Sequence, residues 1–253
     1  MLSEERHQKI IEILDQQAVV TVADLVQLLD VSEMTIRRDF DALESRGLLK
    51  RVHGGAVSNR GRSYEPPFML RSTINIEEKK RIAEAAAALV KNGDSVTLDV
   101  GTTTLEIAKN LKTKQDLTVI IRSLHIASEM VDHQGIRVIV TGGFLRQSEL
   151  SLTGYLAERV FSDFYVDKLF LGAGGVDFKA GVTEYHFEEM LVKRAMVRNA
   201  KEIILVVDST KFGNIALAPI IPLKEVHTIV TDKKIKKEIR RELEELGINV
   251  IVV

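Results

Sequence analysis

The sequence predicts an α/β protein made of two domains of different construction. Three observations indicate this: helical spacing of apolar residues before position 58, loss of periodicity around Pro66-Pro67, and alternation of apolar runs with amphipathic stretches afterwards. A chain of 253 residues, 45% of them hydrophobic, is long enough for one large domain or two modest ones. We therefore expect domains at 1–57 and 76–253, joined by a linker at 58–75.

The first domain is expected to contain three short helices followed by a pair of strands. Thr21 and Ser32 stand where the second and third helices begin, and both residue types are preferred N-caps. The third helix is expected to end near Gly47, and Gly54-Gly55 provides a turn between the strands. Apolar residues mark the helices within 10–14, 22–29 and 32–43, and the strands lie within 48–57.

This order of elements is the outline of a winged helix-turn-helix, which places a recognition helix in the major groove of DNA. If Ile36 faces the core, a rotation of about 100° per residue directs Arg38 away from the protein. An arginine there can donate to guanine O6 and N7, although an Arg-Arg pair is also typical of a solvated helix face. The predicted DNA contacts are Ser32, Met34, Thr35, Arg37 and Arg38 on the helix and Lys50, Arg51, His53 and Gly54 on the wing.

The charge of the chain supports this assignment only when it is counted locally. The whole sequence has a formal net charge of −1, which by itself argues against nucleic acid. Residues 1–33 carry two basic and seven acidic side chains, whereas residues 34–62 carry seven basic and three acidic ones. The basic side chains therefore gather on the segment predicted to read DNA.

The second domain is predicted to be Rossmann-like, with a mostly parallel sheet. Continuous apolar runs such as Ile203–Val207 are typical of strands buried on both faces, and amphipathic helices separate them. The expected helices are 76–91, 184–199, 233–246 and two that begin at Thr103 and Leu124. The expected strands are 95–100, 117–121, 136–140, 168–171, 202–207, 226–230 and 249–252.

A glycine followed by three threonines, Gly101 to Thr104, lies between a predicted strand and a predicted helix. The free N–H groups of a first helical turn and threonine hydroxyls can bind a phosphate, although threonine is also an ordinary helix cap. Ligands of parallel sheets bind beyond the carboxyl ends of the strands, so polar residues at other strand ends are expected in the same pocket. The predicted ligand-binding residues are Asp99, Gly101, Thr102, Thr103, Thr104, Arg122, Ser123, Gly142, Gly143, Gly174, Gly175, Asp177 and Lys211.

Two further features of the sequence limit the kinds of site that can be expected. The sequence contains no cysteine, which excludes a disulfide framework, a thiolate zinc site and a cysteine nucleophile. The segment 232–241 is rich in basic residues, but Ile235, Ile239 and Leu243 keep an apolar stripe. A docked helix with a solvated face is therefore expected there, with a second DNA-binding patch as the alternative.

The run VSEMTIRRDF at 31–40, with Leu43-Glu44 and RVHGGA at 51–56, resembles the N-terminal signature of the DeoR-type sugar-responsive transcriptional regulators. The resemblance covers the whole chain, with Phe40 where the family usually has leucine. It implies a repressor whose C-terminal domain is similar to ribose-phosphate isomerase-like sugar-phosphate-binding domains and senses a sugar phosphate or related metabolite. The Gly101–Thr104 turn matches the phosphate-holding loop of such domains.

One strand end departs from the family pattern. The chain has Ile121-Arg122-Ser123 where the family usually has Thr-Asn-Ser. We hypothesise that Arg122 binds an additional or differently placed anionic group of the ligand. The alternative is a surface arginine at the end of a strand.

The leading interpretation is a repressor of a sugar-catabolism operon that binds operator DNA as a homodimer or homotetramer, because one head contacts few base pairs. An activator would differ only in where its operator lies. The alternative is a sugar-phosphate isomerase or deaminase with an accessory DNA-binding domain, with Asp99, Asp177 or Glu184 as candidate base. No signal peptide, apolar span of roughly 18 residues, metal-ligand spacing or cofactor motif is found, so we expect a cytoplasmic non-enzyme without metal or cofactor.

Overall fold

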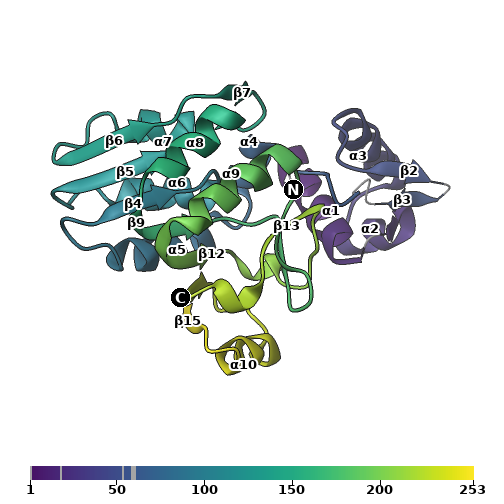
Figure 1. Ribbon diagram of the computed structural model, residues 1–253. Helices are drawn as coiled ribbons and strands as arrows, with labels where there is room; N and C mark the ends of the chain where they lie inside the picture. The colour runs from purple at the N-terminus through teal and green to yellow at the C-terminus, as the bar shows by residue number, and fades with distance from the viewer. Residues whose placement is uncertain (1, 18, 53, 58–60) are drawn as a thin grey trace. The chain divides into compact units, whose positions relative to one another are not determined.

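The computed structural model describes residues 2–17, 19–52, 54–57 and 61–253. The chain divides into two compact units, Met1–Pro66 and Pro67–Val253 (Figure 1). The division falls at Pro66-Pro67, inside the segment predicted to be a linker. Among the described residues, no helix is both long enough and apolar enough to cross a membrane.

The first unit contains three helices and a three-stranded antiparallel sheet, as a winged helix-turn-helix requires. The predicted caps are confirmed: Thr21 Oγ1 accepts from the N–H of Asp24 at 3.1 Å, and Ser32 Oγ accepts from the N–H of Thr35 at 3.2 Å. One strand, β1, was not predicted, because three residues carry too little periodicity to recognise. The elements are α1 Ser3–Gln17, β1 Val19–Thr21, α2 Val22–Leu29, α3 Glu33–Ser45, β2 Lys50–Val52 and β3 Gly55–Val57, with the sheet order β1-β3-β2.

The two glycines at the tip of the wing have different roles. A Cβ on Gly55 would lie 2.2 Å from the carbonyl oxygen of Val20, so only glycine lets β3 pair this closely with β1. Gly54 has a φ of +80°, is exposed, and has open space around its missing side chain. Gly55 therefore serves the packing of the sheet, whereas Gly54 remains a predicted DNA contact.

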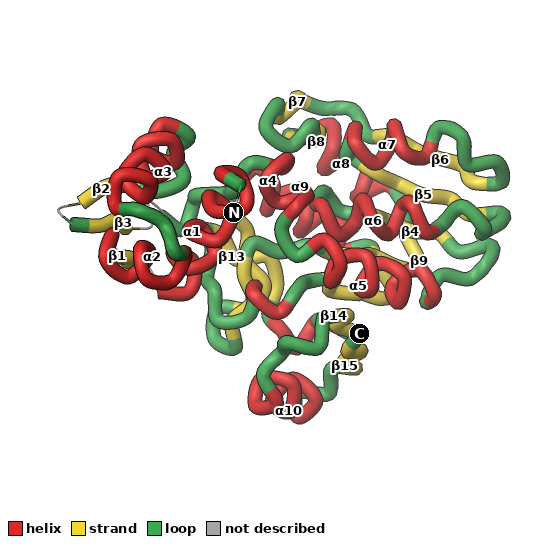
Figure 2. The backbone as a smooth tube through the Cα atoms, turned by 180° about the vertical axis from the view of Figure 1, so that it is seen from behind, coloured by secondary structure: helices red, strands yellow, loops and turns green. Residues whose placement is uncertain are grey.

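The second unit is built on a seven-stranded sheet in the order β15-β14-β12-β9-β4-β5-β6, and all neighbouring strands are parallel. Helices cover both faces (Figure 2), α5 to α7 on one and α8 to α10 on the other. This confirms the predicted parallel sheet. The strands are β4 Ser95–Leu98, β5 Leu117–Ile121, β6 Ile136–Val140, β9 Val166–Leu171, β12 Ala200–Val206, β14 Thr228–Thr231 and β15 Asn249–Val252.

Side chains alternate between the two faces along each strand. Val96 and Leu98 of β4 pack with α5 to α7, and Leu169 and Leu171 of β9 pack with α8 and α9. The helices are α4 Phe68–Thr73, α5 Ile76–Ala88, α6 Thr102–Asn110, α7 Leu124–Met130, α8 Tyr155–Asp163, α9 Phe187–Arg198 and α10 Lys237–Glu245, with 3-10 turns η1 Ser209–Lys211 and η2 Leu223–Glu225. Several predicted boundaries are wrong by two to four residues, as at 184–199, where β11 ends at Glu184 before α9 begins.

The prediction missed two helices, α8 and, within the expected linker, α4, as well as several short antiparallel strands. These strands form the hairpin β7-β8 and the small sheet β10-β11-β13, and each is three or four residues long. Such strands carry no apolar run of the kind that marks the large sheet. Their bounds are β7 Phe144–Arg146, β8 Ser151–Thr153, β10 Gly175–Asp177, β11 Gly181–Glu184 and β13 Ala218–Ile221.

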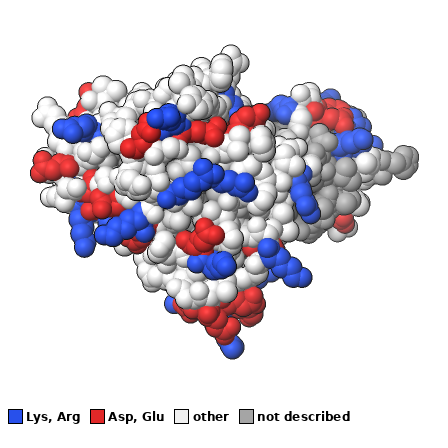
Figure 3. Space-filling model, viewed as in Figure 1, with Lys and Arg blue, Asp and Glu red and all other residues white. Residues whose placement is uncertain are grey.

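The basic segment 232–241 forms a docked surface helix, as expected. Leu243 is buried in the core, and Ile235 is buried in the turn before α10. On the outer face, Arg240 and Arg241 each lie 2.8 Å from a glutamate one turn later. Figure 3 shows acidic and basic side chains together over this helix. The mixed charge disfavours the alternative of a second DNA-binding patch.

Candidate DNA-reading helix and candidate effector site

Helix α3 presents its arginines to solvent, as helical geometry predicted. Ile36, Phe40 and Leu43 are buried, whereas Arg37 and Arg38 are exposed. The orientation of the helix is therefore confirmed, while contact with DNA remains a prediction. Of the other predicted DNA contacts, Ser32, Met34, Lys50, Arg51 and Gly54 are exposed, Thr35 is half-buried, and His53 lies outside the described residues.

A buried carboxylate next to Arg38 fastens α3 to α1. Asp39 accepts hydrogen bonds from Arg6, with Nε at 2.5 Å and Nη2 at 2.9 Å, and His7 Nε2 lies 2.9 Å from the same carboxylate. The hydrogen bond to Asp39 raises the pKa of Arg6. Sequence reasoning counted Asp39 only as a negative charge, and nothing in the local pattern shows its burial. This ion pair fixes the direction in which Arg38 points.

The exposed basic side chains of the first unit differ in their contacts. Arg37 Nη2 lies 3.5 Å from Glu33, and Arg51 forms an ion pair with Asp41. Arg38 forms no ion pair within the described part of the chain. Exposed pairs contribute only about 0–1 kcal/mol, so DNA phosphates can replace them at low cost. Arg38 needs no such exchange before it donates to a base.

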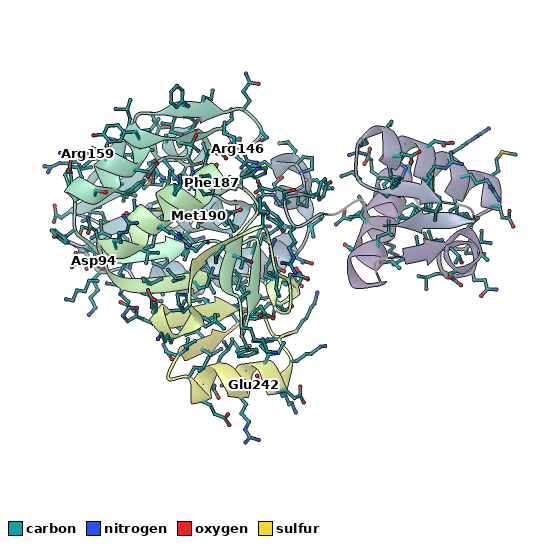
Figure 4. All side chains as sticks on the ribbon, turned by 45° about the vertical axis from the view of Figure 1, so that its right-hand side comes forward. Asp94, Arg146, Arg159, Phe187, Met190 and Glu242 are labelled. Atoms are coloured by element: carbon teal, nitrogen blue, oxygen red, sulfur yellow. The ribbon has the colours of Figure 1, made fainter. Side chains whose placement is uncertain are left out.

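The carboxyl ends of the parallel strands meet at one edge of the large sheet, here called the effector edge. Asp99 follows β4, Arg122 follows β5, and Gly142 follows β6. In Figure 4, Asp94, which precedes β4, and Arg146, which comes after β6, lie at opposite edges of the sheet. The prediction that the strand ends following β4, β5 and β6 lie along one edge is confirmed.

The Gly101–Thr104 turn begins α6 at this edge. The side chain of Thr104 already has a partner within the turn, because its hydroxyl donates to the carbonyl of Gly101 at 2.9 Å. Thr102 is also buried, and Thr103 is half-buried. The first N–H groups of a helix have no partner within the helix, so this turn offers backbone donors together with one partly accessible threonine.

Arg122 is the centre of a buried network of charges. It is completely inaccessible, lies 3.1 Å from Asp99 through Nη2, and forms a second ion pair with Glu189 through Nη1. Lys193 Nζ lies 2.8 Å from Asp99 and 2.5 Å from Glu184. Three carboxylates and two cations thus join the ends of β4, β5 and β11 to α9 below the effector edge.

The network holds Glu189 and Lys193 in their charged forms. Burial alone would raise the pKa of Glu189, but the charge of Arg122 and a hydrogen bond from Ser151 at 2.6 Å lower it to about 2. Burial alone would lower the pKa of Lys193, but Asp99 and Glu184 raise it. Each charge is stabilised by its neighbours and costs free energy without them.

These contacts correct two predictions. Arg122 is neither a surface arginine nor free to bind a ligand anion, because its guanidinium lies between two carboxylates. Asp99 was expected to accept from sugar hydroxyls, but its oxygens already accept from Arg122, from Lys193 and from the N–H of Gly172 at 3.1 Å. Arg122 and Asp99 therefore belong to the buried network that underlies the effector edge.

Other predicted ligand residues prove to be structural. Asp177 belongs to the β10-β11 hairpin, where it accepts from the N–H groups of Lys179 and Ala180, both at 2.8 Å, and these bonds lower its pKa. A Cβ on Gly175 would lie 2.2 Å from the carbonyl oxygen of Asn214. Ser123 caps α7 at 3.3 Å from the N–H of Ile126. Gly142 is exposed, Gly143 is half-buried and Gly174 is buried.

Sequence reasoning missed a buried lysine at this edge. Lys79 is 5% exposed and donates to the backbone carbonyls of Arg71 and Ile74, the latter at 2.5 Å. Its pKa is lowered to about 8, mainly by burial, with the charge of Asp208 opposing this shift and the positive charges of Lys211 and Arg71 adding to it. In the sequence, Lys79-Lys80 looks like any exposed pair on an amphipathic helix. The predicted Lys211 is half-buried, with Nζ 3.5 Å from the hydroxyl of Tyr185.

At the opposite edge of the sheet, an open depression of about 530 Å³ lies between the loops that precede β5 and β6. None of the predicted ligand residues lines this depression. Within the described residues, no group of three or more His, Asp or Glu side chains could hold a metal ion.

A winged helix-turn-helix unit joined to an α/β unit of this topology defines the class of two-domain proteins that combine a DNA-binding head with a sensor domain. The chain belongs to the DeoR family. The family model described as the DeoR-like helix-turn-helix domain matches residues 6–62, and the one described as the DeoR C terminal sensor domain matches residues 74–233. The family predicted from the N-terminal signature is confirmed.

Full-length relatives are similar along nearly the whole chain. The HTH-type transcriptional regulator GolR of Listeria innocua is 37% identical over 246 residues, which is 97% of each chain. The glycerol-3-phosphate regulon repressor of Escherichia coli K12 is 33% identical over 232 residues, 92% of each chain. A solved D-ribose-5-phosphate isomerase in complex with phospho-erythronic acid is similar over 54% of each chain, with 19% identity and a TM-score of 0.40. A likeness of that size says nothing about the activity of this chain.

We expect Arg38→Ala to weaken binding to operator DNA by about 1–3 kcal/mol and to relax base preference at one position, because a contact to one base is lost. Arg51→Ala is the matched comparison, since losing a phosphate contact weakens all sequences alike. Fluorescence anisotropy with operator and random duplexes at one salt concentration measures both. Equal losses on the two duplexes for Arg38→Ala would contradict a base-reading role.

We expect Arg122→Met to lower the free energy of unfolding by about 3–5 kcal/mol, because the buried carboxylates of Asp99 and Glu189 each lose the cation that joins them. Arg159→Met is the control, since Arg159 forms only an exposed pair with Asp163 and should cost no more than about 1 kcal/mol. Urea denaturation of both variants gives the comparison. Similar values for the two would mean that the buried network does not stabilise the fold.

Proposed function

We propose that this protein is a repressor of a sugar-catabolism operon whose operator binding is controlled by a phosphorylated sugar or a related anionic metabolite. The observation that carries the proposal is the pair of basic groups, Lys79 and Lys211, at the edge where the Gly101–Thr104 turn begins α6. Support comes from the match to a sensor domain and from a relative named as the repressor of the glycerol-3-phosphate regulon.

The alternative of an isomerase or deaminase is disfavoured by the state of its candidate bases. Asp99 and Glu184 are both ion-paired to Lys193, and Asp177 is bound by its own hairpin turn. A general base must reach the proton that it abstracts and accept it at a working pH. Carboxylates that are held by a buried lysine or by their own turn are not placed to reach a substrate proton, so we propose a binding domain without catalysis.

We propose a homodimer or homotetramer as the DNA-binding form. One head with a single recognition helix contacts few base pairs, and two heads on repeated half-sites supply the missing selectivity. The sensor unit offers a surface for such a contact: Phe144, Tyr155 and Leu156 are exposed large apolar side chains on β7 and α8. The mass of the purified chain in solution tests this proposal.

We expect one member of a panel of pentose, hexose and triose phosphates to stabilise the chain against thermal unfolding. A ligand at one hundred times its Kd stabilises by about 2.7 kcal/mol. Lys211→Met should weaken the effect at least tenfold in Kd, whereas Lys224→Met, an exposed lysine on η2, should leave it unchanged. Absence of any stabilising phosphate, or conversion of the ligand into a product, would overturn the proposal.

A further inference from the structure

Helix α4 is the first element after the division between the two units, and it lies against the effector edge. The ring of Phe68 stacks on His125 of α7, with centroids 4.1 Å apart and planes 13° from parallel. Arg71 forms an ion pair with Glu149, in the loop between β7 and β8. α4 also packs against α6. The segment through which the linker enters the sensor unit is thus held by residues that follow β5 and β6.

The end of α4 is held by Lys79 alone among the described cations. Lys79 Nζ donates to the carbonyls of Arg71 and Ile74, which are the last turn of α4 and its C-cap. Carbonyl groups at a helix C-terminus attract a cation, because they carry the negative end of the helix dipole. An ammonium group has three donors, so one remains after these two bonds.

The charge of Lys79 is poorly neutralised where it lies. It forms no ion pair within the described residues, although it is buried. Lys211 adds positive charge nearby, whereas Arg71 is paired with Glu149, and Glu106 is paired with Lys109 at 2.6 Å. Asp208 is the other neighbouring carboxylate, and it accepts from the N–H of Thr210 at 3.1 Å. An anion placed beside Lys79 would therefore relieve an unfavourable local charge.

We propose that Lys79 couples the effector to the linker. The anionic group of the effector accepts the third hydrogen bond of the Lys79 ammonium group. The ammonium group stays protonated, its charge is balanced by the anion, and it then holds α4 more firmly to the sensor unit. The proposal rests on the proposed function, since it needs an anionic effector at this edge. In this arrangement the side chain of Lys79 contacts both the effector and the last turn of α4, the first helix after the DNA-binding head. Binding of the effector and docking of α4 then strengthen each other reciprocally.

The docking of α4 can be followed by hydrogen–deuterium exchange of the backbone amides of residues 68–75, using the full chain and inorganic phosphate as the probe. Sodium chloride at matched ionic strength controls for screening. We expect phosphate to slow exchange in this segment at least fivefold, without a similar change in residues 91–94, which precede β4 at the opposite edge. Lys79→Gln should abolish the slowing, and Lys80→Gln should preserve it, because Lys80 is exposed and paired with Glu77.

Reciprocity supplies a second test that does not alter Lys79. Phe68→Ala removes the stack on His125 and the cation–π contact with Arg71, and it leaves Lys79 and Lys211 unchanged. We expect it to weaken phosphate binding about tenfold, whereas Met69→Ala, at an exposed position on the same helix, should not. A Phe68→Ala variant that binds phosphate as tightly as the wild type would overturn the coupling.

Failure of the coupling through Lys79 and failure of the proposed function give different experimental results. If phosphate raises the melting temperature but leaves exchange of residues 68–75 unchanged, the coupling through Lys79 is wrong and an anionic effector site is retained. If neither phosphate nor any sugar phosphate raises the melting temperature, the proposed function fails and the coupling fails with it.

Discussion

The buried ion pairs around Arg122 are the constraint on which the sensor unit depends. They join strand ends and a helix that are far apart in the sequence, and they do so directly beneath the edge where a ligand is expected. Such a network is costly unless every member is present, which makes the arrangement rigid. The carboxylates of this network are paired with cations of their own, and none of the described ion pairs joins them to Lys79 or Lys211.

The DNA-binding head follows the same physical logic on a smaller scale. The buried pair between Arg6 and Asp39 fastens the recognition helix to α1, while the neighbouring Arg38 points outward. In both units, buried charge pairs fix the geometry of the elements that carry the proposed contacts. Helix α4 lies between the two networks along the chain, at the start of the second unit.

Residue patterns predicted the features that follow from local geometry. The outward direction of Arg38 follows from the burial of Ile36, and the alignment of Asp99 and Arg122 follows from parallel strands. Pairings between distant residues were not predictable: Glu189 gives no sign in the sequence that it faces Arg122, and Lys79 looks like its exposed neighbour Lys80. Asp177 was misassigned because the two strands of its hairpin have three and four residues, which is too short to show a periodic pattern in the sequence.

The most direct test of the account is the affinity of the full chain for its operator with and without the sugar phosphate that stabilises it most. Linkage requires that a ligand which controls the head change this affinity, and typical couplings correspond to roughly 5- to 150-fold. We expect a change of at least fivefold in the Kd for operator DNA at constant salt. An unchanged Kd, with the sugar phosphate demonstrably bound, would contradict the claim that the sensor unit controls DNA binding.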